Sequence, residues 1–403
     1  MSRTRIALAT LLVAAGTAVA PASELFDGCA DQAASKYEPG YEDTGPVDGG
    51  SFYAYDAIEA CTAALAEDPA NVQLMAWLGN AYAADNQAPK AVPLLEPAAA
   101  AGNVVALRAL GDLLILGKGT SQDKERGTAL LAQAAEQGFA PAALSLGYSY
   151  EFGDGVTADP VTATQFYMQA AEGGVPRAQI IVADRYQRGL GIDRDDALAF
   201  GWLQRAAGAG DGEGNYRLGV AYLEGRGTPV DEEQARAAFQ RSADAYDPRG
   251  STALGYMTER GLAGDADPDE AWSLYSGARY YNLPLAKHNL ARLEEAGTGT
   301  DINLEEARAL YAEAAGAGEM RAAVNLALML LQGAGGPQDV AGAFDWTERA
   351  ARAGNAAALN NLGRLHELGI GTAADPAAAR RLYREAAARG YALAAENLSR
   401  IGN

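Results

Sequence analysis

The sequence predicts an all-α protein, a right-handed α-solenoid in which antiparallel helix pairs stack as eight 36-residue repeats between two caps. Three observations predict this fold. Glycine recurs every 36 residues, at Gly117, Gly153, Gly189, Gly225, Gly261, Gly297, Gly333 and Gly369. Between these glycines, apolar and small residues follow helical spacing. A constant period of this size is typical of repeat proteins, in which each repeat buries its apolar face on its neighbours.

The chain begins with a segment typical of an export signal. A basic start precedes an apolar, uncharged run over 6–20, which is too short for a membrane span. Two cleavage sites of the small-x-small type compete, one ending at Ala20 and one at Ala22. Cleavage after Ala20 would leave Pro21 at the new N-terminus, so we favour Ala22. We therefore expect a signal peptide over 1–22 and a periplasmic or secreted protein without direct membrane insertion.

Residues 23–103 are expected to form an irregular N-terminal cap. Helical patterns cover 57–66 and 72–84, whereas 36–52 is rich in Gly, Pro and acidic residues and predicts a loop. The two cysteines of the chain, Cys29 and Cys61, both lie in this region. In an oxidising compartment we expect them to form a disulfide. The alternative is two unpaired small apolar side chains.

Each repeat between 104 and 390 predicts a helix A, a glycine-rich turn and a helix B. Helix A of the second repeat ends at Gly153, because a helix commonly exits through a left-handed residue that glycine adopts without strain. Asp159 and Pro160 then predict the start of helix B. This cap position recurs with the same period, at Asp123, Asp159, Asp195, Asp231, Asp267, Asn303, Asp339 and Asp375.

A second periodic position in helix A holds only Gly or Ala. Its occupants are Gly111, Gly147, Ala183, Gly219, Gly255, Ala291, Ala327 and Gly363. Larger side chains there would push two helices apart, so the position predicts close helix–helix contact. After the last repeat, 391–403 predicts a capping helix that covers the final apolar face.

The repeated pattern A-x-x-x-L-G-x-x-Y-x-x-G-x-G, followed by D-x-x-x-A-x-x-x-x-x-x-A-A-x-x-G, resembles the Sel1-like repeat, a relative of the tetratricopeptide repeat. The matching residues of the second repeat are Ala142, Leu146, Gly147, Tyr150, Gly153, Gly155, Asp159, Ala163, Ala170, Ala171 and Gly174. Residues 57–101 are closer to a tetratricopeptide unit. The resemblance implies that the A helices line a concave surface that binds other proteins. Secreted bacterial proteins similar to this one act as periplasmic adaptors, which implies a protein partner such as the periplasmic part of a membrane protein.

The pattern is least regular over 240–296. Thr258 and Glu294 replace the helix-A tyrosine, Ala263 replaces the second turn glycine, and Tyr246 and Asn282 replace the terminal glycine. Two interpretations remain open: drift compensated by repacking, or a partner-specific break in the stack.

The net charge of the chain and the motifs that it lacks exclude several classes of function. A formal charge of −20 repels phosphate backbones, so nucleic acid is not an expected partner, whereas a basic protein segment would be attracted. His288 and His366 are two repeats apart and have no nucleophile at a fixed spacing. The glycines around Lys118 lack the Ser or Thr of a phosphate loop, and 265–276 lacks the glycine and glutamate of a calcium loop. We therefore expect no catalytic residue, cofactor or metal.

These observations favour a non-enzymatic interaction scaffold that regulates an envelope signalling or assembly system. The alternative is a cell-wall-related or β-lactam-binding enzyme on the same scaffold, which labelling with a penicillin probe would detect. A role in envelope polysaccharide export differs from the first hypothesis only in its partner.

If the A helices face inward, the variable positions between their packing residues point into a groove. Tyrosine and arginine at such positions commonly carry binding energy. The candidate partner-binding residues are Arg108, Asp112, Leu144, Tyr148, Glu151, Arg177, Asp184, Gln187, Tyr216, Arg249, Tyr256, Glu259, His288, Arg292, Glu295, Asn360, Arg364 and Glu367.

Overall fold

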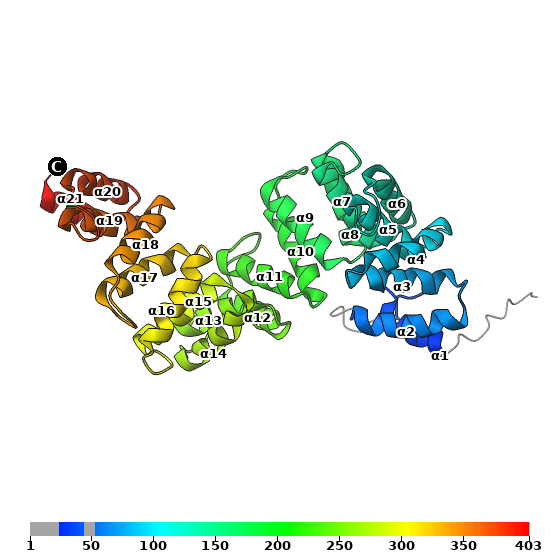
Figure 1. Ribbon diagram of the computed structural model, residues 1–403, viewed down its shortest axis with the longest axis horizontal. Helices are drawn as coiled ribbons and strands as arrows, with labels where there is room; N and C mark the ends of the chain where they lie inside the picture. The colour runs from blue at the N-terminus through cyan, green and yellow to red at the C-terminus, as the bar shows by residue number, and fades with distance from the viewer. Residues whose placement is uncertain (1–23, 44–52, 403) are drawn as a thin grey trace, which may run out of the picture. The chain divides into compact units, whose positions relative to one another are not determined.

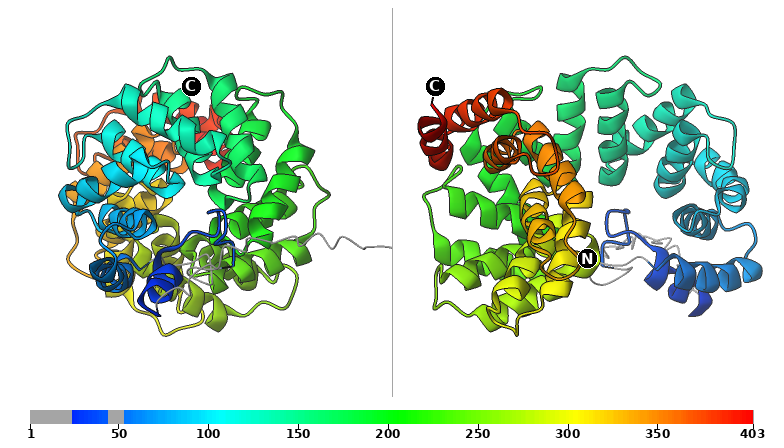
Figure 2. Two further views of the ribbon diagram at one scale, coloured as in Figure 1. Left: turned by 90° about the vertical axis from the view of Figure 1, so that its right-hand side faces the viewer. Right: turned by 60° about the vertical axis from the view of Figure 1, so that its left-hand side comes forward.

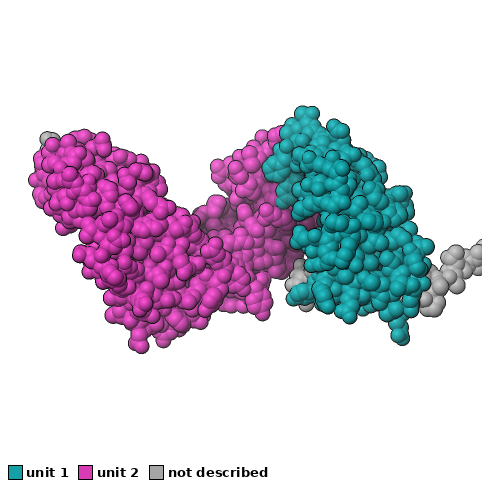
Figure 3. Space-filling view, in the orientation of Figure 1, with its two compact units in different colours: residues 1–159 teal, residues 160–403 magenta. Residues whose placement is uncertain are grey.

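The computed structural model describes residues 24–43 and 53–402, and within these ranges the protein is all-helical, with 21 α-helices, one short 3-10 helix and no strand (Figure 1). The predicted signal peptide over 1–22 lies outside the described residues. None of the described helices combines the length and the apolar character that a membrane span requires. The chain divides into two compact units, unit 1 up to Asp159 and unit 2 from Pro160 (Figure 3).

Unit 1 begins with helices of the N-terminal cap and continues into the first repeats. Its helices are α1 (Glu24–Ala33), α2 (Ala54–Glu67), α3 (Val72–Ala84), α4 (Ala88–Ala100), α5 (Val104–Leu116), α6 (Lys124–Glu136) and α7 (Ala140–Phe152). Each helix packs on the next one in the chain.

Unit 2 continues the same alternation of A and B helices (Figure 2). Its helices are α8 (Pro160–Glu172), α9 (Pro176–Arg188), α10 (Asp196–Gly208), α11 (Gly212–Glu224), α12 (Glu232–Asp244), α13 (Pro248–Arg260), α14 (Pro268–Ala278), η1 (Arg279–Tyr281), α15 (Pro284–Ala296), α16 (Leu304–Gly316), α17 (Met320–Gln332), α18 (Val340–Arg352), α19 (Ala356–Leu368), α20 (Pro376–Ala388) and α21 (Ala392–Ile401). The odd-numbered helices from α5 to α19 are the A helices.

Helix ends follow the predicted signals. All eight periodic glycines end an A helix in the left-handed conformation, with φ between +64° at Gly297 and +74° at Gly153. The cap side chain accepts a hydrogen bond from the first turn of helix B at Asp123, Asp195, Asp231, Asp267, Asn303, Asp339 and Asp375. These local interactions fix where each helix starts and stops.

The small position of helix A permits close approach of helix B within a repeat. A Cβ on Gly219 would lie 2.6 Å from the ring of Phe239, and one on Gly255 would lie 2.8 Å from the ring of Tyr275. Because real Cβ contacts are longer, the aromatic ring occupies the space that a side chain would need. The predicted reason for Gly or Ala is confirmed.

The second turn glycine makes the tightest contact between successive repeats. A Cβ on Gly227 would lie 2.0 Å from the backbone oxygen of Asp196, and one on Gly335 would lie 2.0 Å from that of Leu304. Both oxygens belong to the first turn of helix B in the preceding repeat. The turn of one repeat therefore rests on the backbone of the one before it.

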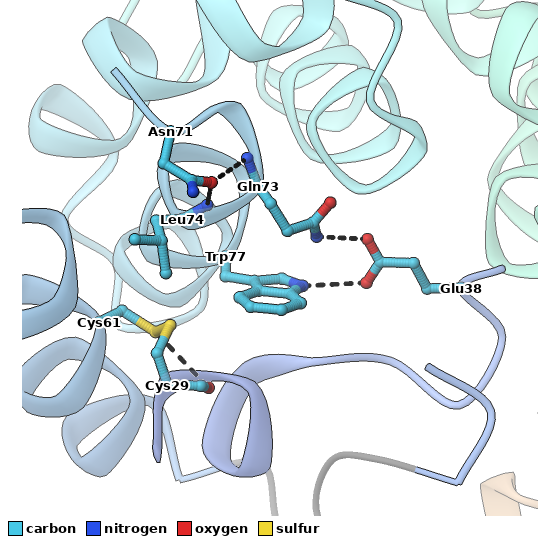
Figure 4. Close-up of a disulfide and its surroundings, with 7 residues drawn as sticks. All are labelled: Cys29, Glu38, Cys61, Asn71, Gln73, Leu74 and Trp77. Atoms are coloured by element: carbon cyan, nitrogen blue, oxygen red, sulfur yellow. Dashed lines mark hydrogen bonds between the residues drawn. A yellow bond between two sulfur atoms is a disulfide. The ribbon is translucent and has the colours of Figure 1, made fainter. Parts of the chain in front are cut away.

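The N-terminal cap contains a helix, α1, to which the sequence analysis assigned no element. Cys29 of α1 and Cys61 of α2 form the predicted disulfide (Figure 4). Beside it, the buried carboxylate of Glu38 accepts hydrogen bonds from the Trp77 indole at 2.9 Å and from the Gln73 amide. Burial raises the pKa of Glu38 although both donors oppose the rise. These contacts tie the non-helical segment after α1 to α3.

Repacking accompanies one of the irregular positions in unit 2. Glu294, which replaces a helix-A tyrosine, is buried and accepts a hydrogen bond at 2.8 Å from the indole of Trp272 in the preceding B helix. Two other repeat junctions place an aromatic residue of helix B against the same position, Phe200 against Tyr222 and Phe344 against His366. At this site the drift interpretation is therefore favoured.

The glycine contact between repeats predicts a position-dependent cost of alanine. Gly335→Ala should lower the free energy of unfolding by about 1–2 kcal/mol for the left-handed backbone and by about 1–3 kcal/mol more for the overlap with Leu304. Gly318→Ala is the matched control, because Gly318 also has a positive φ but nothing lies within 4 Å of its added Cβ. Urea unfolding followed by circular dichroism measures both. Equal losses in the two variants would contradict the contact.

Candidate protein-binding groove

The A helices lie side by side in both units. In unit 1, α5 contacts α3 and α7, and in unit 2, α11 contacts α9 and α13. The variable side chains of neighbouring A helices therefore share one face of each unit. This arrangement is the one that the repeat pattern implies, and it places the candidate residues in rows.

A groove of about 640 Å³ opens on this face of unit 2. Its wall brings together five of the predicted residues, Tyr216, Arg249, Tyr256, His288 and Arg292. They come from α11, α13 and α15. Apolar side chains complete the wall, namely Val220, Leu223, Phe239, Ala253, Leu283 and Leu285. A smaller depression of about 210 Å³ shares Tyr216 and Arg249 with this groove and adds the predicted Asp184 and Gln187.

Arginine is the charged residue of the groove wall. Arg249, Arg260, Arg292 and Arg321 line it, and no carboxylate does among the described residues. The guanidinium of Arg249 lies 5.4 Å from the ring centre of Tyr216, and that of Arg260 lies 5.6 Å from that of Tyr256. Such cation–π contacts hold the arginines against the wall and leave part of each exposed.

Carboxylates behind the wall orient three of these arginines. Asp247 accepts from Arg249 Nε at 3.0 Å and Nη2 at 2.6 Å, and Glu319 accepts from Arg321 Nε at 2.9 Å and Nη2 at 3.0 Å. Arg292 of α15 is paired with Glu259 of α13. The bidentate pairs of Arg249 and Arg321 restrict each guanidinium to one orientation.

Glu213 of α11 forms ion pairs with three arginines. Its carboxylate lies 2.7 Å from Arg217, 3.1 Å from Arg177 and 3.5 Å from Arg249. Burial opposes ionisation of Glu213, but the hydrogen bond from Arg217 and the three positive charges outweigh it and lower the pKa of this carboxyl. These pairs connect α9, α11 and α13 along the face.

His288 lies in the groove wall in its neutral form. The side chain is only 7% exposed, and its Nδ1 atom has no hydrogen-bond partner in the part of the chain that the structure describes. Burial lowers the pKa of His288 to about 4; nearby Arg321 and Arg292 act in the same direction, and Glu319 acts against them. The ring lies 5.8 Å from that of Tyr311.

Three predicted glutamates have a structural partner within their own repeat. The hydroxyl groups of Tyr275, Tyr311 and Tyr383 donate to Glu259, Glu295 and Glu367, at 3.2, 2.8 and 2.7 Å. Each tyrosine lies on helix B, 16 residues after its glutamate on helix A. Burial and the neighbouring carboxylate raise the pKa of each tyrosine, which stays protonated and keeps donating. Sequence reasoning missed this pairing.

The remaining predicted residues lie outside the groove. In unit 1, Arg108 is paired with Asp112 at 3.4 Å and donates to Asn80, and the rings of Tyr148 and Phe152 stack. Leu144 is half-buried and Glu151 is exposed in the same unit.

Near the end of unit 2, the predicted residues adjoin α21. Asn360 is only 2% exposed and accepts a hydrogen bond from Asn397, whereas Glu367 is paired with Arg400. Asn397 and Arg400 both belong to α21. Arg364 is exposed. The burial of Asn360 therefore makes it a contact to the final helix.

Several groove residues were absent from the sequence-based set. Arg321 stands in register with Arg249, two repeats later, and Leu283 and Leu285 hold the two positions that carry the acid and the arginine in the repeats on either side. Aligning the starts of the A helices would have revealed that two leucines replace the acid and the arginine in this repeat. Arg260 lies at an exposed helix end and carries no periodic signal.

Comparison with known proteins agrees with this architecture. A family model described as the Sel1 repeat matches residues 104–139, 140–175, 176–211, 212–247, 248–278, 284–319, 321–355 and 356–391. None of the curated proteins matches the chain.

Two solved structures resemble the protein at the level of sequence and fold. A protective antigen of uropathogenic Escherichia coli that displays an SLR fold is 28% identical, with 87% of this chain and 84% of that chain covered and a TM-score of 0.56. A Sel1 repeat protein from Oxalobacter formigenes is 27% identical, with 77% of this chain and 90% of that chain covered and a TM-score of 0.57.

The pairing of helix-B tyrosines with helix-A glutamates predicts energetic coupling. Tyr311→Phe and Glu295→Ala should each destabilise the protein, and the double variant should lose about 1 kcal/mol less than the sum of the two, because the hydrogen bond is lost only once. A double-mutant cycle by urea unfolding measures this coupling. Additive losses would mean that the bond contributes nothing.

The neutral state of His288 predicts a loss of stability in acid. Between its usual pKa of 6.5 and its folded value of about 4, the unfolded chain binds a proton that the folded protein does not. Stability therefore falls as the pH drops through this window, by up to about 3 kcal/mol from this group. His288→Phe should remove that part of the pH dependence, measured as thermal midpoints against pH for both proteins. Parallel curves for the two proteins would rule the assignment out.

Proposed function

Since the chain belongs to the Sel1 repeat family, whose members generally mediate protein–protein interactions, we propose that it is a non-enzymatic periplasmic scaffold that binds a partner protein in the groove of unit 2. The partner is a segment of an envelope protein, such as the periplasmic part of a membrane protein, and the bound complex regulates a signalling or assembly system.

The observation that supports this function most strongly is the composition of the groove. Tyrosine, arginine and aliphatic side chains from several A helices surround about 640 Å³ of open space. Tyrosine and arginine dominate the energetically important positions of protein interfaces, where a partner closes over them. The typical Sel1 scaffold is non-catalytic, which agrees with a binding role.

The disulfide in the N-terminal cap supports the proposed compartment. Disulfides persist in oxidising environments, of which the bacterial periplasm is one, and they are rare in a reducing cytosol. The net charge of the whole chain favoured a basic segment as partner, but the arginines of the groove favour the opposite charge at this site.

Site-specific photo-crosslinking tests the proposed function. A photoreactive residue in place of Tyr256, which is 43% exposed in the groove, should capture a partner protein in cells of the source organism. The matched control is Leu198 on the B helix α10, which is 49% exposed. We expect one product, identified by mass spectrometry, from position 256 and none from position 198. Equal capture from both positions, or none from the groove, would refute binding at this site.

A further inference from the structure

Charged and apolar side chains alternate along the groove of unit 2, and this alternation indicates which ligand the groove can bind. The N-cap residue and the second helical residue of α13, α15 and α17 place two side chains in equivalent positions. In α13 these are Asp247 and Arg249, and in α17 they are Glu319 and Arg321. In α15, between them, the same positions hold Leu283 and Leu285. At the second of the two positions, the groove lining therefore carries arginine, leucine and arginine in turn.

The two outer arginines are prepared for an anionic group. In each of these two repeats the acid accepts from the backbone N–H as well as from the guanidinium of its arginine, so that one closed motif occurs twice. The acid contacts Nε and Nη2. Among the described residues, the Nη1 groups of Arg249 and Arg321 have no hydrogen-bond partner, and both arginines line the groove. A carboxylate from outside can therefore bind Nη1 without displacing the internal pair.

The charge around the groove is positive in an acidic chain. Arg249, Arg260, Arg292 and Arg321 line it, and among the described residues no carboxylate does, because Asp247, Glu259 and Glu319 pair with three of these arginines from outside the lining. Since every charged side chain of the lining is an arginine while the whole chain carries −20, the groove favours a negative ligand.

The middle of the row favours an apolar side chain. Leu283 and Leu285 line the groove together with Val220, Leu223 and Phe239, and Leu285 is 38% exposed. Neutral His288, which is largely buried, lines the same groove. An apolar anchor placed here would remove these surfaces from water, which favours binding.

We propose that the groove binds an extended acidic peptide in which one apolar residue lies between two carboxylates. Taking about 10 Å, the usual spacing of packed helices, for each step from one A helix to the next places Arg249 and Arg321 about 20 Å apart across α15. An extended chain rises about 3.3 Å per residue, which separates the two carboxylates by about six residues with the apolar residue midway. This inference rests on the proposed function and specifies the chemistry of the partner.

Fluorescence anisotropy with the full chain tests the proposal. The probe is a labelled synthetic peptide with a leucine midway between two glutamates about six residues apart. One comparison peptide has lysine in place of both glutamates, and another has serine in place of the leucine. We expect the glutamate peptide to bind, and both comparison peptides to bind at least about tenfold more weakly.

Variants of the protein locate the binding site. Arg249→Gln and Arg321→Gln should each weaken binding of the glutamate peptide about fivefold or more, because each removes one charge-assisted contact. Arg352→Gln is the matched control, since Arg352 is an exposed arginine of α18 that also has one carboxylate partner, Glu348. Circular dichroism of each variant confirms that the fold is retained.

Each outcome separates this inference from the proposed function. Equal or tighter binding of the lysine peptide, or an equal effect of Arg352→Gln, overturns the acidic-peptide assignment. Absence of binding by every peptide overturns it as well. In all these cases, capture from position 256 and not from position 198 would leave the groove as a protein-binding site with a different ligand chemistry.

Discussion

The structure depends on the close backbone contact between the second turn glycine of one repeat and the first turn of helix B in the preceding repeat. At Gly155, Gly191, Gly227, Gly299 and Gly335, an added Cβ would lie within 2.2 Å of a backbone oxygen. This distance leaves no room for any side chain. Because the contact is made by backbone atoms, it sets the spacing between repeats regardless of which side chains the rest of the repeat carries.

That independence explains how repeats 240–296 depart from the pattern at other positions and still stack. Tyr246 and Asn282 replace the terminal glycine and keep a positive φ of 58° and 53°. Ala263 is the exception, since it replaces the second turn glycine itself, with a positive φ of 54°. Left-handed conformations of these residues cost free energy, which packing elsewhere must offset. The same stretch contributes Arg249, Tyr256 and Leu285 to the groove. The irregular repeats and the candidate site therefore coincide, although nothing in the packing requires them to.

Much of the fold could be predicted from the sequence because its determinants are local. Glycine ends, aspartate caps and the small position of helix A are read from single residues, and the structure bears them out at Gly153, Asp195 and Gly255. The disulfide could be predicted because the chain has two cysteines. The helix α1 was missed, since its ten residues carry no repeat signal and pack through Cys29.

The candidate site was harder to predict because it combines side chains from several helices. Register identified Tyr216 and Arg249, but it could not show that Glu259 is engaged by Tyr275 and Arg292, nor that Asn360 is buried under α21. Those facts depend on distances between helices. Leu285 was missed for a different reason, since an apolar residue in a helix is usually interpreted as part of the core. It becomes informative only when its repeat is aligned with the two neighbouring repeats, which hold Arg249 and Arg321 at the same position.

Side-chain pairs within one repeat and side-chain pairs between successive repeats have different consequences when repeats are duplicated or moved along the chain. A glutamate and tyrosine such as Glu295 and Tyr311 lie within one repeat, so duplication or transplantation of that repeat carries both partners along. The pairs Trp272–Glu294 and Glu259–Arg292 join successive repeats. Moving a repeat to another place in the chain would separate these partners and leave a carboxylate without the donor that the neighbouring repeat supplies. The order of the middle repeats is thus constrained by the side-chain pairs between them. The hydrogen bonds within each repeat would be kept in any order.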